Sequence, residues 1–197
     1  MRRKTFDAIA TMAGLVLAIV LAIGGGLLLW GHSVVSTDVH NQLAAQKIVF
    51  PAAGSPEIKA LPAADASAMT AYAGQTMTTG AQAQAYADHF IAVHLTEIGG
   101  GKTYSQLSAA AMAQPKNTAL AGQVATIFKG TTLRGMLLNA YGFWTMGQIA
   151  LIGAIASFAA AGLLLILSLF GVWHLRRAPE AAEVFGRVSH PARVRTA

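Results

Sequence analysis

Two long stretches of the chain are apolar and carry no charged side chain. Residues 8–37 contain no Lys, Arg, Asp or Glu, and residues 135–175 contain none either. A helix that crosses the hydrocarbon core of a bilayer needs about 20 apolar residues, and both stretches are longer than that. The pattern predicts transmembrane helices at residues 9–31 and 143–173, joined by a segment of residues 32–142.

The first apolar stretch is expected to be a retained anchor rather than a cleaved signal sequence. Its apolar core is longer than the roughly 7–15 residues of a signal peptide, and no Ala-X-Ala cleavage motif follows it closely. Trp30 lies at its end, and Trp144 and Trp173 flank the second stretch. Tryptophan favours the interface between membrane and water, so these positions fit two spans.

The net charge of +6 lies mostly at the two ends of the chain. Residues 1–8 carry three basic side chains and one acidic one, and residues 174–197 carry five Arg and two Glu. Cytoplasmic flanks of membrane proteins have such an excess of Arg and Lys. We therefore expect both ends in the cytoplasm, residues 32–142 outside, and a disordered tail over residues 174–197. Because topology accounts for the basic charge, nucleic acid is not an expected partner.

The chemistry available to the chain is narrow. It contains no cysteine, which excludes disulfides, thiol nucleophiles, iron–sulfur clusters and Cys-ligated zinc. No ionisable side chain lies inside either predicted hydrocarbon segment, although pumps, proton relays and voltage sensors need such groups there. The spans are therefore expected to be anchors, and we expect no cofactor.

Small residues recur at helical spacing along both predicted spans. In lipid, close backbone approach across small residues supplies much of the attraction between helices. We expect the two spans to pack on each other in this way, with self-association or a partner helix as the alternative. The candidate packing residues are Gly14, Ala18, Ala22 and Gly26 in the first span and Gly153, Ser157 and Ala161 in the second.

The joining segment is predicted to be mainly helical, which makes the chain an all-α membrane protein. Residues 47–64 contain three prolines and are expected to form an extended loop, because proline disfavours helix at and before its own position. Thr79, Thr103 and Asn117 are suited to helix N-caps, and Gly99 to a left-handed helix end. The expected helices cover residues 79–98, 103–113, 117–130, and 132 onward, continuous with the second span.

A glycine-rich loop is expected between the first two of these helices. Its Gly-Lys-Thr sequence is part of a phosphate-binding loop, but the full motif needs a further glycine where Thr96 stands and a strand before it. We interpret the loop as a helix connection that can contact a lipid headgroup or a protein partner. The candidate partner-loop residues are Gly99, Gly100, Gly101, Lys102 and Thr103.

His89, His94 and Glu97 are the one cluster of metal-ligand residue types in the sequence. Two ligands on one helix face are three or four residues apart. His94 and Glu97 have that spacing, whereas His89 lies roughly 140° around the helix from His94. A third ligand would have to come from elsewhere, with His40 or Asp88 nearest, so we expect a solvated or hydrogen-bonded helix surface and no metal.

Four segments carry a resemblance to a known family: LAAQKIVFPAAGSP, ADHFIAVHLTEIGGGKTYSQLS, LRGMLLNAYGFW and WHLRR. They are similar to a family of small actinobacterial two-pass membrane proteins, over nearly the whole chain. The resemblance implies the two-span topology. Members are often labelled aromatic ring-opening dioxygenase, a reaction that needs iron held by two His and a carboxylate. Here the one such set is His89, His94 and Glu97, and its spacing on one helix does not suit iron.

Three functional hypotheses follow. The first is a non-enzymatic accessory or scaffold protein of the cell envelope that docks on a larger membrane complex. The second is a sensor-like module whose outer domain binds a ligand and shifts the spans. The third is a metal-dependent dioxygenase. We favour them in that order, because the sequence lacks a complete catalytic set.

Overall fold

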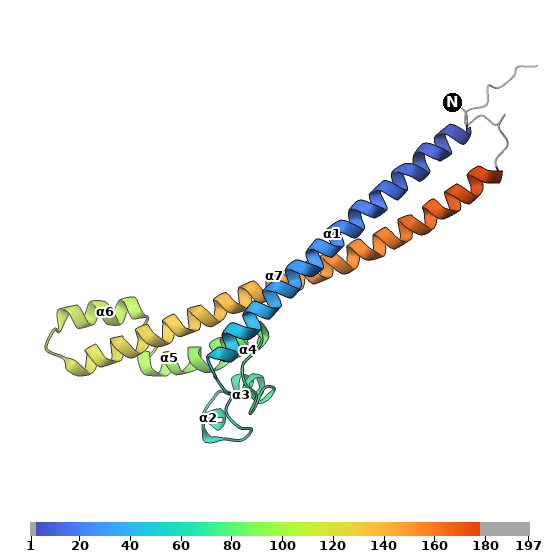
Figure 1. Ribbon diagram of the computed structural model, residues 1–197. Coiled ribbons are helices and arrows are strands. Elements are labelled where there is room, and N and C mark those ends of the chain that lie inside the picture. Colours follow the sequence, from blue (N-terminus) through green and yellow to red (C-terminus); the bar gives the residue numbers. More distant parts are fainter. Residues whose placement is uncertain (1–2, 178–197) are drawn as a thin grey trace, which may run out of the picture. The chain divides into compact units, whose positions relative to one another are not determined.

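The structure is a computed structural model that describes residues 3–177, and it is mostly helical. Between residues 3 and 177 it contains no strand, and only an isolated antiparallel bridge joins Val49 to Thr76. The elements in chain order are α1 (Arg3–Ala45), α2 (Pro56–Lys59), α3 (Ala63–Thr70), α4 (Gly80–Tyr86), the π-helical turn η1 (Ala87–Ile91), α5 (Ala92–Gly99), α6 (Tyr104–Ala113) and α7 (Thr118–Arg177) (Figure 1).

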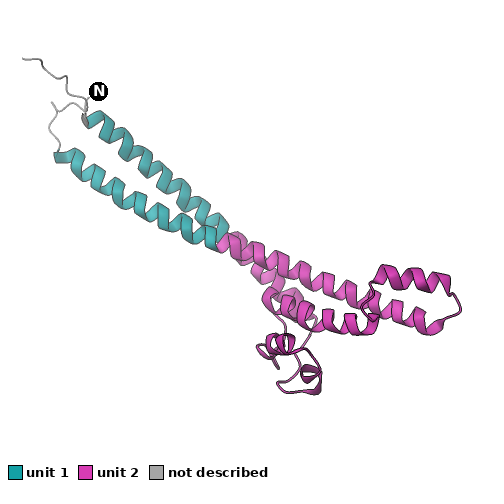
Figure 2. Cartoon of the chain, turned by 180° about the vertical axis from the view of Figure 1, so that it is seen from behind, with its two compact units in different colours: residues 1–29, 152–197 teal, residues 30–151 magenta. Residues whose placement is uncertain are grey.

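The chain divides into two compact units, coloured separately in Figure 2. Unit 1 comprises residues 1–29 and 152–197, and unit 2 comprises residues 30–151. The expectation of a disordered tail over residues 174–197 is wrong for residues 174–177, which form the last turn of α7, and residues 178–197 lie outside the described residues.

Helices α1 and α7 each contain a stretch long and apolar enough to cross a membrane. Only 11% of each stretch is buried within the structure. A helix that is apolar on all sides belongs either to the core of a large protein or to a membrane. The described chain itself therefore covers little of these stretches.

Helix α7 corrects the expectation of a break near Gly130. It runs unbroken from Thr118 to Arg177, so it contains both the expected outer helices and the second apolar stretch. Gly130 does not end a helix; a Cβ there would lie 3.3 Å from Cγ of Leu95, so the glycine permits close approach of α5. Thr132 is not an N-cap, because its Oγ1 donates back to Phe128 O at 2.9 Å.

Three other helix boundaries differ from those expected from the sequence. The expected helix 79–98 is interrupted by η1, where the Ala92 N–H donates to Ala87 O. The left-handed residue after α5 is Gly100 (φ 57°), one position later than expected. Residues 47–64 are not entirely extended, since α2 begins at Pro56 with Ser55 as N-cap. Proline suits the first turn of a helix, where its missing N–H has no partner to lose.

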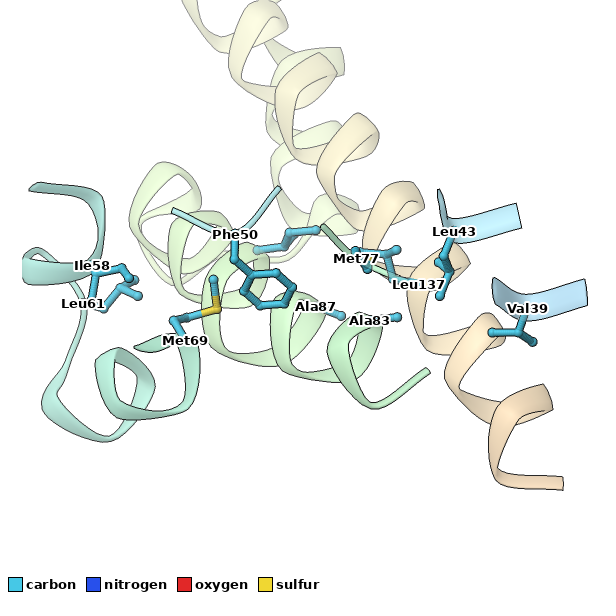
Figure 3. Close-up of a cluster of buried hydrophobic side chains, with 11 residues drawn as sticks. Val39, Leu43, Phe50, Ile58, Leu61, Met69, Met77, Ala83, Ala87 and Leu137 are labelled. Carbon is cyan, nitrogen blue, oxygen red and sulfur yellow. The ribbon is translucent and has the colours of Figure 1, made fainter. Parts of the chain in front are cut away.

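The hydrophobic core of unit 2 gathers side chains from most of its elements (Figure 3). Phe50, Met69, Met77 and Leu137 are the largest fully buried side chains. Figure 3 shows Ile58, with Leu61, at one end of the cluster and residues of α1 and α7 at the other. The Pro-rich segment is thereby fastened to the two long helices, which form the frame of the unit. The members are Val39, Leu43, Phe50, Ile58, Leu61, Met69, Met77, Ala83, Ala87, Ile91 and Leu137.

Candidate functional site

In unit 1, α1 and α7 pack along a seam of small residues. Its most buried positions recur every seven residues on both helices. A seven-residue repeat keeps one face of a helix turned toward its neighbour, as in coiled coils. Small side chains there let the two backbones approach, which favours association in lipid. The seam positions are Thr11, Ala18 and Gly25 in α1 and Ala154, Ala161 and Ser168 in α7.

Glycines tighten this seam at several places, including Gly171, where a Cβ would meet the side chain of Thr11. A Cβ on Gly14 would lie 2.7 Å from Oγ of Ser168, which is closer than real Cβ atoms come. A Cβ on Gly25 would lie 3.3 Å from the ring of Phe158. A side chain at Gly14 would therefore require the Ser168 side chain to rotate or the helices to shift.

The packing residues expected from the sequence separate into two groups. Gly14, Ala18, Ser157 and Ala161 are buried or half-buried along the seam, and Gly153 faces Leu28. Ala22 and Gly26 are exposed. Four residues advance a helix by about 40° more than a full turn, so a stripe of strict four-residue spacing drifts away from the neighbouring helix.

The predicted partner loop lines a shallow cavity in unit 2. Gly100 and Gly101 have φ of 57° and 75°, and they carry the chain from α5 to α6. Thr103 then caps α6 through a capping box with Gln106. Lys102 and Thr103 line a cavity of about 390 Å³, whose other walls include Thr131 of α7. The loop is thus a fixed connection that presents one lysine beside several hydroxyl groups.

The turn η1 is held by polar contacts to two other elements. Arg134 of α7 donates from one guanidinium nitrogen to Asp88 Oδ1 at 2.7 Å and from Nε to Ala87 O at 3.2 Å. Nδ1 of His89 donates to Asp65 Oδ1 of α3 at 2.7 Å. The bond to Ala87 O gives a second donor to the carbonyl that accepts the π-helical hydrogen bond. These pairs explain a π-turn whose energy is otherwise unfavourable.

The side chains considered as metal ligands are directed to different partners. His89 pairs with Asp65, whereas Nδ1 of His94 donates to Phe90 O at 2.8 Å. Glu97 is exposed near the end of α5. In the described part of the chain, no three His, Asp or Glu side chains are close enough together to hold a metal ion.

Besides the cavity at the partner loop, unit 2 has two further grooves of a size suited to a ligand or a partner. The α1/α7 groove has a volume of about 450 Å³ and combines carboxylate and amide groups with apolar side chains. The aromatic groove, between α5 and α7, has a volume of about 380 Å³. The α1/α7 groove is lined by Val35, Asp38, Gln42, Met136, Asn139 and Phe143 among others, and the aromatic groove by Tyr86, Phe90, His94, Ile98, Lys129 and Leu133 among others.

A row of tilted rings in contact forms one wall of the aromatic groove, with interplanar angles of 42° and 46° between successive rings. Ring centroids are 4.9 Å apart between Tyr86 and Phe90 and 4.4 Å apart between Phe90 and His94. Burial raises the pKa of Tyr86 above its ordinary value, because the apolar surroundings disfavour the phenolate. Lys129 of α7 also lines this groove.

Comparison with protein-family models, with curated proteins and with solved structures finds no match to this chain. The class that the fold defines is accordingly a mostly helical protein with two long apolar helices suited to a membrane.

The seven-residue seam, the polar pairs of η1 and the two grooves were not predicted from the sequence. The seam was detectable, because Thr11, Ala18 and Gly25 are small or weakly polar at seven-residue spacing. The pairing of Arg134 with Asp88 joins residues far apart in the sequence, so it cannot be predicted from a local sequence pattern. The two grooves are likewise products of tertiary packing.

Proposed function

We propose that this chain is a non-enzymatic integral membrane protein of the cell envelope, an accessory or scaffold subunit that docks on a larger membrane complex. One observation carries the proposal: the outward side chains of the two long helices in unit 1 are large, apolar and uncovered by the rest of the chain. Such a surface favours contact with lipid, and in water it would associate. We assign residues 9–31 and 143–173 to the bilayer.

The orientation follows from charge. Arg and Lys are concentrated at both ends of the chain, so we assign residues 1–8 and 174–197 to the cytoplasm. Residues 32–142 then lie outside.

The α1/α7 groove supports the docking role. Met136 and Phe143 line it and are 63% and 53% exposed. Asp38 and Gln42 add polar groups on the α1 side. Methionine and phenylalanine beside polar groups suit the apolar face of a partner helix, with the polar groups fixing its orientation.

The polar pairs of η1 support the non-enzymatic part of the proposal. Asp88 is engaged with Arg134, and His89 with Asp65. Each pair joins two elements of unit 2, so removing either group would disturb the fold. We therefore assign these groups a structural role in unit 2.

The proposal is tested by purifying the tagged chain from its own membrane in mild detergent and identifying associated proteins by mass spectrometry. We expect one stoichiometric membrane-protein partner that is lost with Phe143→Glu. Met112→Glu is the matched control, since Met112 is 75% exposed in α6 outside the groove, and it should retain the partner. A chain recovered alone would contradict the accessory role, and recovery in the soluble fraction would contradict the membrane assignment.

A sensor-like role is the second candidate, and the aromatic groove favours it. Its volume of about 380 Å³ and its wall of contacting aromatic rings suit a small apolar molecule. A thermal-shift screen of small apolar molecules tests this role. Stabilisation that disappears in Phe90→Ala but persists in Met112→Ala would favour the sensor, and a screen without stabilising compounds would count against it.

A further inference from the structure

The last turns of α7 carry an apolar face that ends in arginine. Ile166, Leu169, Phe170 and Trp173 line a shallow cavity of about 350 Å³. Each of the four is more than half exposed, so no other part of the described chain covers the face. Arg177 follows Trp173 by four residues and therefore lies on the same side of the helix.

The Arg177 guanidinium is held in place by the tryptophan. Its central carbon lies 4.2 Å from the ring centroid of Trp173, in a cation–π arrangement. A guanidinium stacked in this way keeps its N–H donors at its edge, where they can meet a phosphate. Among the ion pairs of the described residues, none joins Arg177 to a carboxylate.

The dimensions of this face match one leaflet of a bilayer. From Ile166 to Arg177 the helix rises about 16 Å, at about 1.5 Å per residue. Half of a hydrocarbon core about 30 Å thick is about 15 Å. An acyl chain lying along Ile166 and Phe170 thus brings its headgroup to the level of Trp173 and Arg177.

We propose that the α7 face from Ile166 to Arg177 binds one anionic phospholipid, with an acyl chain in the cavity and its phosphate on the Arg177 guanidinium. The inference rests on the proposed membrane function and adds a lipid of defined charge to it. Arg177 is selective for an anionic headgroup because a zwitterionic lipid brings its own cation to the same place. Trp173 acts by fixing the guanidinium.

The test uses the full chain, purified in a non-ionic detergent that has no surface charge of its own. Dioleoyl phosphatidylglycerol and dioleoyl phosphatidylcholine are added in turn, and bound lipid is counted by native mass spectrometry. We expect one phosphatidylglycerol to bind in preference to phosphatidylcholine. Losing one charge-assisted contact, in Arg177→Gln or Trp173→Ala, should weaken that binding about tenfold.

Arg176→Gln is the matched control, because it removes the same charge from the neighbouring position. It should leave the binding nearly unchanged, and Arg177→Lys should show an intermediate loss because lysine lacks the planar group. Equal losses in Arg176→Gln and Arg177→Gln, or equal binding of both lipids, would overturn the inference. Resistance of the protein to carbonate extraction separates these outcomes from failure of the membrane assignment itself.

Discussion

Gly80, the first residue of α4, marks a contact that tolerates no side chain. A Cβ there would meet the Trp144 side chain of α7, with Cγ at 2.6 Å. Because Trp144 packs against the hydrophobic core of unit 2, it cannot move aside without disturbing its neighbours. We expect Gly80→Ala to lower the free energy of unfolding by about 1–3 kcal/mol, as overpacking does in protein cores.

Thermal unfolding followed by circular dichroism in detergent measures this effect. Gly122→Ala is the matched control, since a Cβ on Gly122 meets nothing within 4 Å. Alanine favours helix over glycine, so the control should be neutral or stabilising by up to about 1 kcal/mol. A Gly80→Ala protein as stable as Gly122→Ala would show that Trp144 does not pack on α4.

Tyr86 makes the stability of unit 2 depend on alkaline pH. Burial raises the pKa of its phenol in the folded state above the value of about 10 expected for the unfolded chain. The unfolded chain therefore releases this proton first as pH rises. The stability contribution is fully present below pH about 10 and is lost as pH rises through the folded-state pKa.

Denaturant unfolding at pH values from 8 to about 11 tests this dependence. Tyr86→Phe should show a smaller loss of stability over that range than the native chain. Tyr104→Phe, at an exposed position of α6, should keep the native dependence. Identical alkaline profiles for the native chain and Tyr86→Phe would contradict the prediction.

At the scale of elements, the pairing of α1 and α7 in unit 1 depends on the seven-residue seam. Gly14→Leu puts a branched side chain where a Cβ alone would lie 2.7 Å from Ser168 Oγ. We expect the two helices to separate locally and the melting temperature to fall by several degrees, since about 1 kcal/mol corresponds to about 2–4 °C in a chain of this size.

Ala22→Leu is the control, and it distinguishes packing of the two helices on each other from self-association through the exposed small residues. Ala22 is exposed, so leucine there should leave the melting temperature unchanged. Loss of self-association in Ala22→Leu, measured by chemical cross-linking in membranes, would show that the exposed small residues form a second interface. A melting temperature unchanged in Gly14→Leu would remove the seam as the basis of pairing.

The turn η1 is an element whose conformation depends on a distant residue. Arg134→Met removes the donor to Ala87 O and the partner of Asp88. Because both side chains are about one third exposed, the loss is expected to be only about 1 kcal/mol. Hydrogen exchange at the Ala92 amide, which donates to Ala87 O, should become about fivefold faster. Lys129→Met on the same helix should leave that exchange unchanged.

The elements show how far local sequence rules reach. Thr79 and Thr103 form capping boxes as their side chains predict, and Asn117 accepts from the Leu120 amide at 3.0 Å. These devices act within four residues, so the sequence alone specifies them. The prediction of a helix end at Gly130 was wrong, because this glycine instead makes room for Leu95 of α5. That contact comes from a distant element, so the local sequence does not show it. The π-turn depends on Arg134 in the same way.

At the scale of the whole molecule, unit 1 exposes large aliphatic side chains, whereas unit 2 buries an apolar core. Residues such as Val20 and Ile152 are 57% and 67% exposed although they are aliphatic. Unit 2 instead has an apolar core of its own, built around Phe50 and Met69. Charge-free stretches in the sequence indicated which residues need a nonpolar environment. They did not indicate the grooves, because those arise where helices distant in sequence meet.

This difference predicts a pattern of chemical labelling. The chain has no cysteine, so a maleimide can label only a cysteine introduced by substitution. In intact cells, a membrane-impermeant maleimide should label Lys102→Cys but not Thr5→Cys, and permeabilised cells should allow both. Val20→Cys should stay unlabelled in either case until the membrane is dissolved with a denaturing detergent, because lipid covers a side chain that the protein leaves exposed. Labelling of Thr5→Cys in intact cells would reverse the orientation, and labelling of Val20→Cys in permeabilised cells would mean that water, not lipid, surrounds unit 1.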